Sequence, residues 1–279
     1  NDLPIGTEVT FIESGMTVDG YSVSSTFTKT VNSGVNTTTA TAGRLYAAET
    51  APTGAFVNTY IRDTGSLRLK KTVTVNGVMP SEEDFALVKG TYTILLNPKG
   101  TQTQKIVKFI IDEQGKVTAE VGGSLATLDK DGYVVIDNLP TGIYRIFETE
   151  LTPLANKGIL PVSPTGGETE IEITKNQATI PTVEIINNKD IGQLKISKTL
   201  KRSSNREVEF TFTVELKDKK GEAVTGTFPA TLNQNNGKIE TTVSFDDDGQ
   251  LQPNLKLHAD ESIVIRQIPA GANYTVSET

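Results

Sequence analysis

Three short segments of this chain alternate apolar and polar side chains as β-strands do, yet each places one polar residue among the apolar positions. These residues are Lys71 within residues 67–73, Glu148 within residues 144–148 and Asn187 within residues 183–187. Because every second side chain of a strand lies on the same face, an amine, an acid and a carboxamide are predicted to enter a hydrophobic core. A polar group in such a place needs a partner, so the three are expected to share one core.

The same pattern recurs elsewhere in the chain. A second lysine segment contains Lys198, further acid segments end in Glu13 and Glu278, and a further asparagine segment contains Asn58. Each acid segment follows a turn with Pro and Gly, as in residues 139–142. The recurrence indicates internal repeats.

Composition favours an all-β protein and narrows its partners. Only 36% of the 279 residues are hydrophobic, and there is no Cys and no Trp. This suits narrow two-layer β cores without disulfides. The net charge of −7 provides no basic stripe for nucleic acid and no polybasic membrane patch. We find no membrane span or signal peptide and expect a mature or excised soluble segment.

Turn residues divide the chain into tandem immunoglobulin-like β-sandwiches stacked end to end as a semi-rigid rod. Short polar joints at residues 63–65 and 190–192 are the expected boundaries. Residues 64–190 contain one complete repeat. Residues 1–63 contain only the acid and asparagine strands, the C-terminal part of a repeat, and residues 191–279 contain only the lysine and acid strands, its N-terminal part. Either a neighbouring chain or further sequence is expected to complete them.

These segments resemble a known family. The frames GSLRLKKTV at residues 65–73, GANYTVSE at residues 271–278 and FVNTY at residues 56–60 resemble the intramolecular isopeptide domains of Gram-positive sortase-assembled pilins and surface adhesins. The streptococcal pilin-type repeat, a relative of the collagen-adhesin B-type (CnaB-like) domains, is the nearest in appearance. The resemblance implies an extracellular protein of the cell wall or pilus, with other pilin subunits as partners and no metal or cofactor.

In that family, lysine and asparagine on the first and last strands condense beside an acid. Carried over, Lys71 is the nucleophile, Asn187 the acceptor and Glu148 the acid that moves protons. Asn188 is the alternative acceptor, although its own face of the strand is less apolar. The outer residues form an incomplete or intermolecular set, in which Lys198 would meet Asn58 of the next chain. That set comprises Lys198, Glu278, Glu13 and Asn58.

Elementary chemistry allows this reaction. Burial disfavours the ammonium form of lysine and lowers its pKa from about 10.4, which makes the amine a nucleophile. The amine then attacks the carboxamide while the acid transfers protons and ammonia leaves. No enzyme activity beyond this self-reaction is expected.

Four other interpretations compete. Each polar residue taken alone would more often be an edge lysine, a surface acid or a turn asparagine. The run at residues 246–249 suits a polar turn better than a calcium site. The chain could instead be an adhesin whose loops bind a host matrix protein or glycan, although only 6% of residues are aromatic. A hydrolase is disfavoured, because the single histidine, His258, lies near no nucleophile motif.

Overall fold

The computed structural model describes residues 3–31, 34–39, 42–47, 52–100, 103–201 and 207–279. Strands dominate, so the predicted all-β class is confirmed. The helical elements are α1 (Phe85–Val88), α2 (Leu151–Asn156) and the 3-10 turn η1 (Thr165–Gly167). Among the described residues, no helix has the length and hydrophobicity needed to span a bilayer.

The first strand group forms two small antiparallel sheets. Its strands are β1 (Glu8–Ile12), β2 (Tyr21–Val31), β3 (Gly34–Thr39), β4 (Ala42–Tyr46) and β5 (Thr53–Arg62). β1 pairs with β4, and β2 lies between β3 and β5. Among the residues described in this group, Phe27 and Leu45 are the only buried apolar side chains. This group therefore has very little core.

The middle group is a two-layer β-sandwich. One sheet has the order β10-β9-β8-β7-β12-β14, and the other has the order β11-β6-β15-β13. Its core includes Leu67 and Ile185 from the four-stranded sheet and Phe109 and Ile146 from the six-stranded sheet. The bounds are β6 (Thr64–Val75), β7 (Gly90–Pro98), β8 (Lys105–Ile111), β9 (Val117–Val121), β10 (Ser124–Ala126), β11 (Val134–Pro140), β12 (Gly142–Glu148), β13 (Ile159–Ser163), β14 (Glu168–Ile173) and β15 (Thr182–Lys189).

The last group also packs two sheets around one core. Their orders are β16-β22-β18-β19-β20 and β21-β17-β23, and the core includes Ile196, Val214 and Ile265. The first strand of the group, β16, lies directly before Lys198 and is an edge strand of its sheet. The bounds are β16 (Ile191–Ser197), β17 (Phe210–Lys217), β18 (Gly226–Gln234), β19 (Gly237–Phe245), β20 (Leu251–Gln252), β21 (Leu255–Leu257), β22 (Ser262–Pro269) and β23 (Asn273–Glu278).

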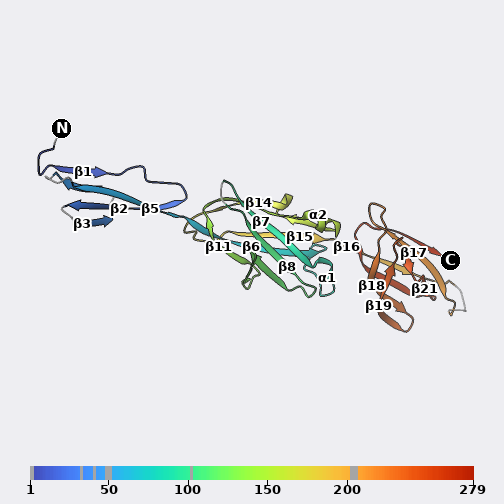
Figure 1. Ribbon diagram of the computed structural model, residues 1–279. Helices are drawn as coiled ribbons and strands as arrows, with labels where there is room; N and C mark the ends of the chain where they lie inside the picture. The colour runs from blue at the N-terminus through green and yellow to red at the C-terminus, as the bar shows by residue number, and fades with distance from the viewer. Residues whose placement is uncertain (1–2, 32–33, 40–41, 48–51, 101–102, 202–206) are drawn as a thin grey trace.

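The three groups follow one another along an elongated molecule with its termini at opposite ends (Figure 1). Polar contacts cross both joints. Lys175 Nζ lies 2.9 Å from Asp63 Oδ1, and hydrogen bonds from Lys175 and Ser22 lower the pKa of the Asp63 carboxyl. At the other joint, Gln267 Nε2 donates to Asp84 Oδ1 at 2.9 Å. Direct side-chain contacts therefore hold neighbouring groups together.

Two local predictions can be compared with the structure. Residues 246–249 form the predicted polar turn, since Asp246 Oδ1 accepts from the backbone N–H groups of Asp248 at 3.1 Å and Gln250 at 2.8 Å. No cluster of potential metal ligands occurs in the described ranges. The second concerns residues 81–88, where Ser81 follows Pro80 and precedes an acidic and then apolar run, a pattern that predicts a short helix capped by Ser81. The helix begins only at Phe85, because the Ser81 hydroxyl donates to the Asp84 carboxylate instead of capping the helix.

Candidate functional site

Three strands of the middle sandwich bring the predicted polar residues together. β15 runs parallel to β6, with Ile185 opposite Lys71, so Asn187 is only two residues further along. Glu148 ends β12 in the facing sheet, opposite Ile94 of β7. The lysine and asparagine therefore project from neighbouring strands, and the acid reaches them from the opposite layer.

The side chains are buried and close together. Lys71 Nζ lies 3.3 Å from Glu148 Oε1, and both side chains are 0% exposed. Asn187 Nδ2 donates to Glu148 Oε2 at 2.7 Å. One carboxylate thus contacts both the amine and the carboxamide, and the burial predicted for all three positions is confirmed.

Hydrogen bonding at this site is incomplete. The 3.3 Å contact has the distance of an ion pair but not the direction of a hydrogen bond, so Lys71 Nζ and Glu148 Oε1 have no hydrogen-bond partner. Asn187 Oδ1 has none either. These are three of the four buried side-chain polar atoms without a partner in the described parts of the chain. Each such atom costs about 1–3 kcal/mol, so the arrangement is unfavourable as an end state.

Burial also changes the acid–base properties of the lysine. It lowers the pKa of Lys71 to about 8, although the negative charge of Glu148 opposes the shift. The ring of Tyr92 lies 5.0 Å from Lys71 Nζ, and its hydroxyl donates to the Val88 carbonyl. Sequence reasoning missed Tyr92. Its alternation with Ile94 and Leu96 on β7 was the available signal.

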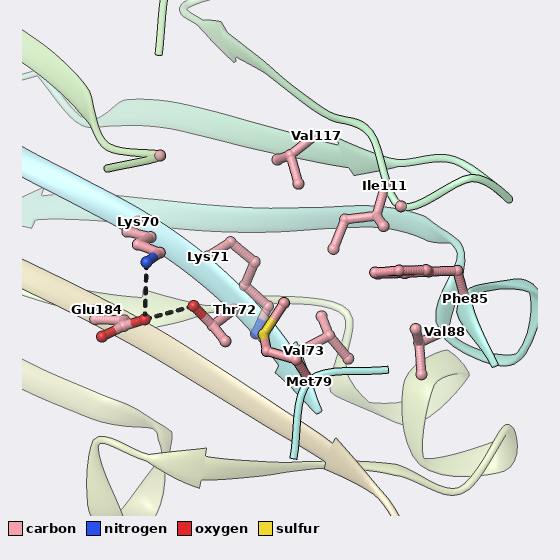
Figure 2. A pocket seen from close by; sticks show the side chains of 12 residues that line it. Lys70, Lys71, Thr72, Val73, Met79, Phe85, Val88, Ile111, Val117 and Glu184 are labelled. Atoms are coloured by element: carbon pink, nitrogen blue, oxygen red, sulfur yellow. Dashed lines mark hydrogen bonds and ion pairs between the residues drawn. The ribbon is translucent and has the colours of Figure 1, made fainter. Parts of the chain in front are cut away.

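Neighbouring lysines on β6 have different environments. Figure 2 shows Lys70 directed to Glu184, with Nζ 3.7 Å from Oε1. A cavity of about 280 Å³ lies beside this part of β6 and is lined by apolar side chains such as Met79 and Phe85 and by polar ones that include Lys70 and Glu184. Lys70 is partly exposed, whereas Lys71 is enclosed. Lys70 lies on the opposite side of the strand's alternation from Lys71, which predicts a solvated side chain, and the structure agrees.

The structure distinguishes the two candidate asparagines. Asn188 Oδ1 accepts from Thr74 Oγ1 and from the Gly77 N–H, both at 2.8 Å, while its Nδ2 donates to Asp190. These bonds connect Asn188 to the end of β6, to the turn after it and to the joint that follows β15. Asn187 is the asparagine that lies against Glu148.

The first group contains an acid and an asparagine in the same relation. Asn58 Nδ2 donates to Glu13 Oε1 at 2.6 Å, and Ser25 Oγ donates to Glu13 Oε2 at 3.1 Å. Asn58 Oδ1 is the fourth buried polar atom without a partner in the described regions. We call Glu13 and Asn58 the N-terminal half-site, because no lysine of the described ranges is bonded to either residue.

The last group contains a lysine and an acid. Lys198 Nζ lies 2.8 and 2.7 Å from the two carboxylate oxygens of Glu278 and 4.0 Å from the centre of the Phe210 ring. The side chains of Lys198 and Glu278 are 17% and 45% exposed. Lys198 and Asn58 thus lie in separate groups, each beside its own acid. A contact between them in neighbouring chains remains a prediction.

Comparisons with known proteins agree with the resemblance in the motifs. Residues 192–279 match a family model described as "Domain of unknown function (DUF7601)". The chain is 33% identical over 88 residues to the pilus tip adhesin Cpa of Streptococcus pyogenes. That match covers 31% of this chain but only 11% of the adhesin.

Solved structures include distant likenesses. The major pilin of Streptococcus pyogenes has a TM-score of 0.40 and 15% identity, with 77% of this chain and 82% of the pilin covered. The TIE protein of Bacillus anthracis has a TM-score of 0.32 and 13% identity, with 99% and 49% covered. The sequence match to Cpa supports the predicted similarity to streptococcal pilus proteins.

Proposed function

We propose that this chain is a segment of an extracellular pilus or cell-wall surface protein, and that its middle group is stiffened by a self-formed isopeptide bond between Lys71 and Asn187. The observation that carries the proposal is the burial of an amine and a carboxamide against one carboxylate, with three polar atoms left without hydrogen bonds. Similarity to the pilus tip adhesin Cpa supports the cellular setting.

The reaction needs only these three side chains. Transfer of a proton from the Lys71 ammonium to the Glu148 carboxylate gives a neutral pair, which burial favours over two charges. Lys71 Nζ attacks Asn187 Cγ, forming the new C–N bond. Glu148 transfers a proton from the attacking nitrogen to Asn187 Nδ2, the Cγ–Nδ2 bond breaks, and ammonia leaves.

Preorganisation replaces an external catalyst. The strand register holds Lys71 and Asn187 on adjacent strands. The side chain of Glu148 is fully enclosed, so packing restricts its motion and keeps it away from solvent. Well-aligned groups reach effective molarities of roughly 10⁵ M or more. The secondary amide also removes the lysine charge from the core, which relieves the cost of burying it.

The bond would serve a fibre mechanically. It would join β6, the first strand of the middle group, to β15, its last strand. Tension entering at Thr64 and leaving at Lys189 would then pass through a covalent link near both strands' ends rather than through the strands between them. A stalk or shaft segment carries load of this kind.

A ligand-binding adhesin is the second candidate. That function predicts an exposed apolar patch, and ten of the 22 large apolar side chains that are exposed in the described residues lie before residue 64. Val57 and Ile61 on β5 are 56% and 66% exposed. These side chains lie beside the unpaired edge of β5. The addition of another strand at this edge therefore explains their exposure more directly than a ligand-binding loop does.

Intact-mass measurement of the full chain tests the proposal. The expected mass is that of the sequence less one ammonia, with a cross-linked peptide joining Lys71 to Asn187 after digestion. The unreacted mass would contradict the proposal. A cross-link ending at Asn188 would retain the chemistry but contradict the assignment of the acceptor.

A further inference from the structure

The open edge of β5 has a counterpart in the middle group. There, β15 pairs antiparallel with β13, with Pro161 opposite Asn187, and pairs parallel with β6 on its other side. β5 likewise pairs antiparallel with β2, with Ser25 opposite Asn58. No strand pairs with its other side in the described part of the chain. The position that β6 occupies beside β15 is therefore open beside β5.

The chemistry at this edge is also incomplete in one respect. Glu13 accepts from Asn58 as Glu148 accepts from Asn187, and in both sites the asparagine Oδ1 is buried without a partner. The component present only in the middle site is the lysine. If β5 were paired as β15 is, a lysine would lie opposite Phe56, two residues before Asn58.

The surroundings indicate that the edge normally has a cover. The sandwich cores contain no residue before Leu67 among those described. On β5, Phe56 and Asn58 are only partly buried, although the corresponding Ile185 and Asn187 are fully buried. A strand with apolar residues at alternate positions would cover these side chains and pair the free backbone groups.

We infer that the N-terminal half-site accepts a lysine-bearing β-strand parallel to β5 and joins it covalently to Asn58. This inference rests on the proposed function. Lysine Nζ would bond to Asn58 Cγ, the Cγ–Nδ2 bond would break, and Glu13 would pass the proton from the amine to the departing ammonia. The partner is an extended segment with apolar residues flanking one lysine at intervals of two.

A second copy of this chain fits the half-site less well. Lys198 directly follows its edge strand β16, but that lysine already has an acid strand, because Glu278 ends β23. β23 pairs with β17 in the register that β12 has with β7. Joining the copies would bring Glu278 and Glu13 to one site that needs a single acid. The occupant should therefore arrive without an acid strand.

The chain's own lysine strand supplies the probe. A synthetic peptide of residues 64–75 is incubated with the full protein, and the products are measured by intact mass and peptide sequencing. The expected product is protein plus peptide less one ammonia, linked from peptide Lys71 to Asn58. Peptides with Lys71→Arg or Lys70→Arg are matched controls, and only the first should fail to react.

Protein variants locate the reaction. Asn58→Ala and Glu13→Gln should abolish the adduct, while the ammonia loss from the middle group continues as an internal control. If the middle group has lost its ammonia but no adduct forms, this inference alone is overturned. If the middle group has not lost its ammonia and no adduct forms, the proposed function is overturned as well. Adducts that persist in Asn58→Ala, or covalent multimers through Lys198 without peptide, would show that another site or a second copy is the partner and would also overturn it.

Discussion

Replacing Glu148 with Gln separates the isopeptide chemistry from the packing of the site. Glu148→Gln keeps the length and shape of the side chain that contacts Asn187, but it removes the carboxylate 3.3 Å from Lys71 Nζ. Proton transfer between the amine and the departing ammonia then has no carrier. We expect the sandwich to fold and the chain to retain its unreacted mass.

The loss of the bond should appear as a large change in thermal stability. A link from Lys71 to Asn187 closes a loop of about 120 residues, and loop-closure entropy makes this worth about 5 kcal/mol against the unfolded chain. With an unfolding entropy of about 2.1 cal/mol/K per residue over about 130 residues, the Tm of the middle group should fall by roughly 15–20 °C. Other effects of the substitution add to this value.

Scanning calorimetry and intact mass, measured on the same samples, check this expectation. Lys70→Gln is the matched control, because it removes only partly exposed contacts, with Glu184 and with the ring of Tyr133, each worth at most about 1 kcal/mol. Ammonia loss in Glu148→Gln equal to that of the wild type would refute the role assigned to the acid. A reacted wild type with the same Tm as the unreacted variant would refute the entropic argument.

Three further outcomes are expected. Because the pKa of Lys71 is lowered to about 8, the rate of ammonia loss during refolding, followed by mass, should increase with pH up to about 8. In Asn187→Ala, which cannot form the bond, the unfolded state binds the lysine proton more tightly than the folded state. The stability of this variant, measured by denaturation, should therefore rise between about pH 8 and the ordinary lysine pKa of 10.5. Asn188→Ala should still lose ammonia, whereas Asn187→Ala should not. Lys175→Ala should raise the pKa of Asp63 in an NMR titration and widen the angular distribution at the first joint in X-ray scattering.

Alternation along single strands was sufficient to predict the centre of the site. Lys71 continues the buried series Leu67 and Leu69, and the same rule favoured Asn187 over Asn188. This succeeded because side-chain direction in a strand is a local property with period two. The all-β class followed from the same periodicity and the frequent turns.

Other parts of the site depend on contacts that no local pattern specifies. The parallel pairing of β6 with β15 joins segments more than 100 residues apart, and it determines which asparagine meets the lysine. Tyr92 resembles any other inward residue of β7 until the fold places its ring beside Lys71. The helix expected from Ser81 was shortened because an exposed hydroxyl had a nearby carboxylate as a competing partner.

Burial, rather than residue type, should decide which lysine of this chain reacts, and Lys198 tests this. Its side chain is 17% exposed and its acid partner Glu278 is 45% exposed, so water can solvate both charges, and exposed pairs of this kind contribute about 1 kcal/mol or less. β16 is an edge strand, so among the strands that the structure describes none with an asparagine covers the pair as β15 covers Lys71. In the unreacted Glu148→Gln variant, where Lys71 remains a free amine, we therefore expect acetylation by an amine-specific reagent, mapped by peptide mass spectrometry, to modify Lys198 as well as the exposed Lys195 but to spare Lys71. Protection of Lys198 in a monomeric sample, or modification of Lys71 in the folded chain, would contradict the argument that enclosure makes the reactive site.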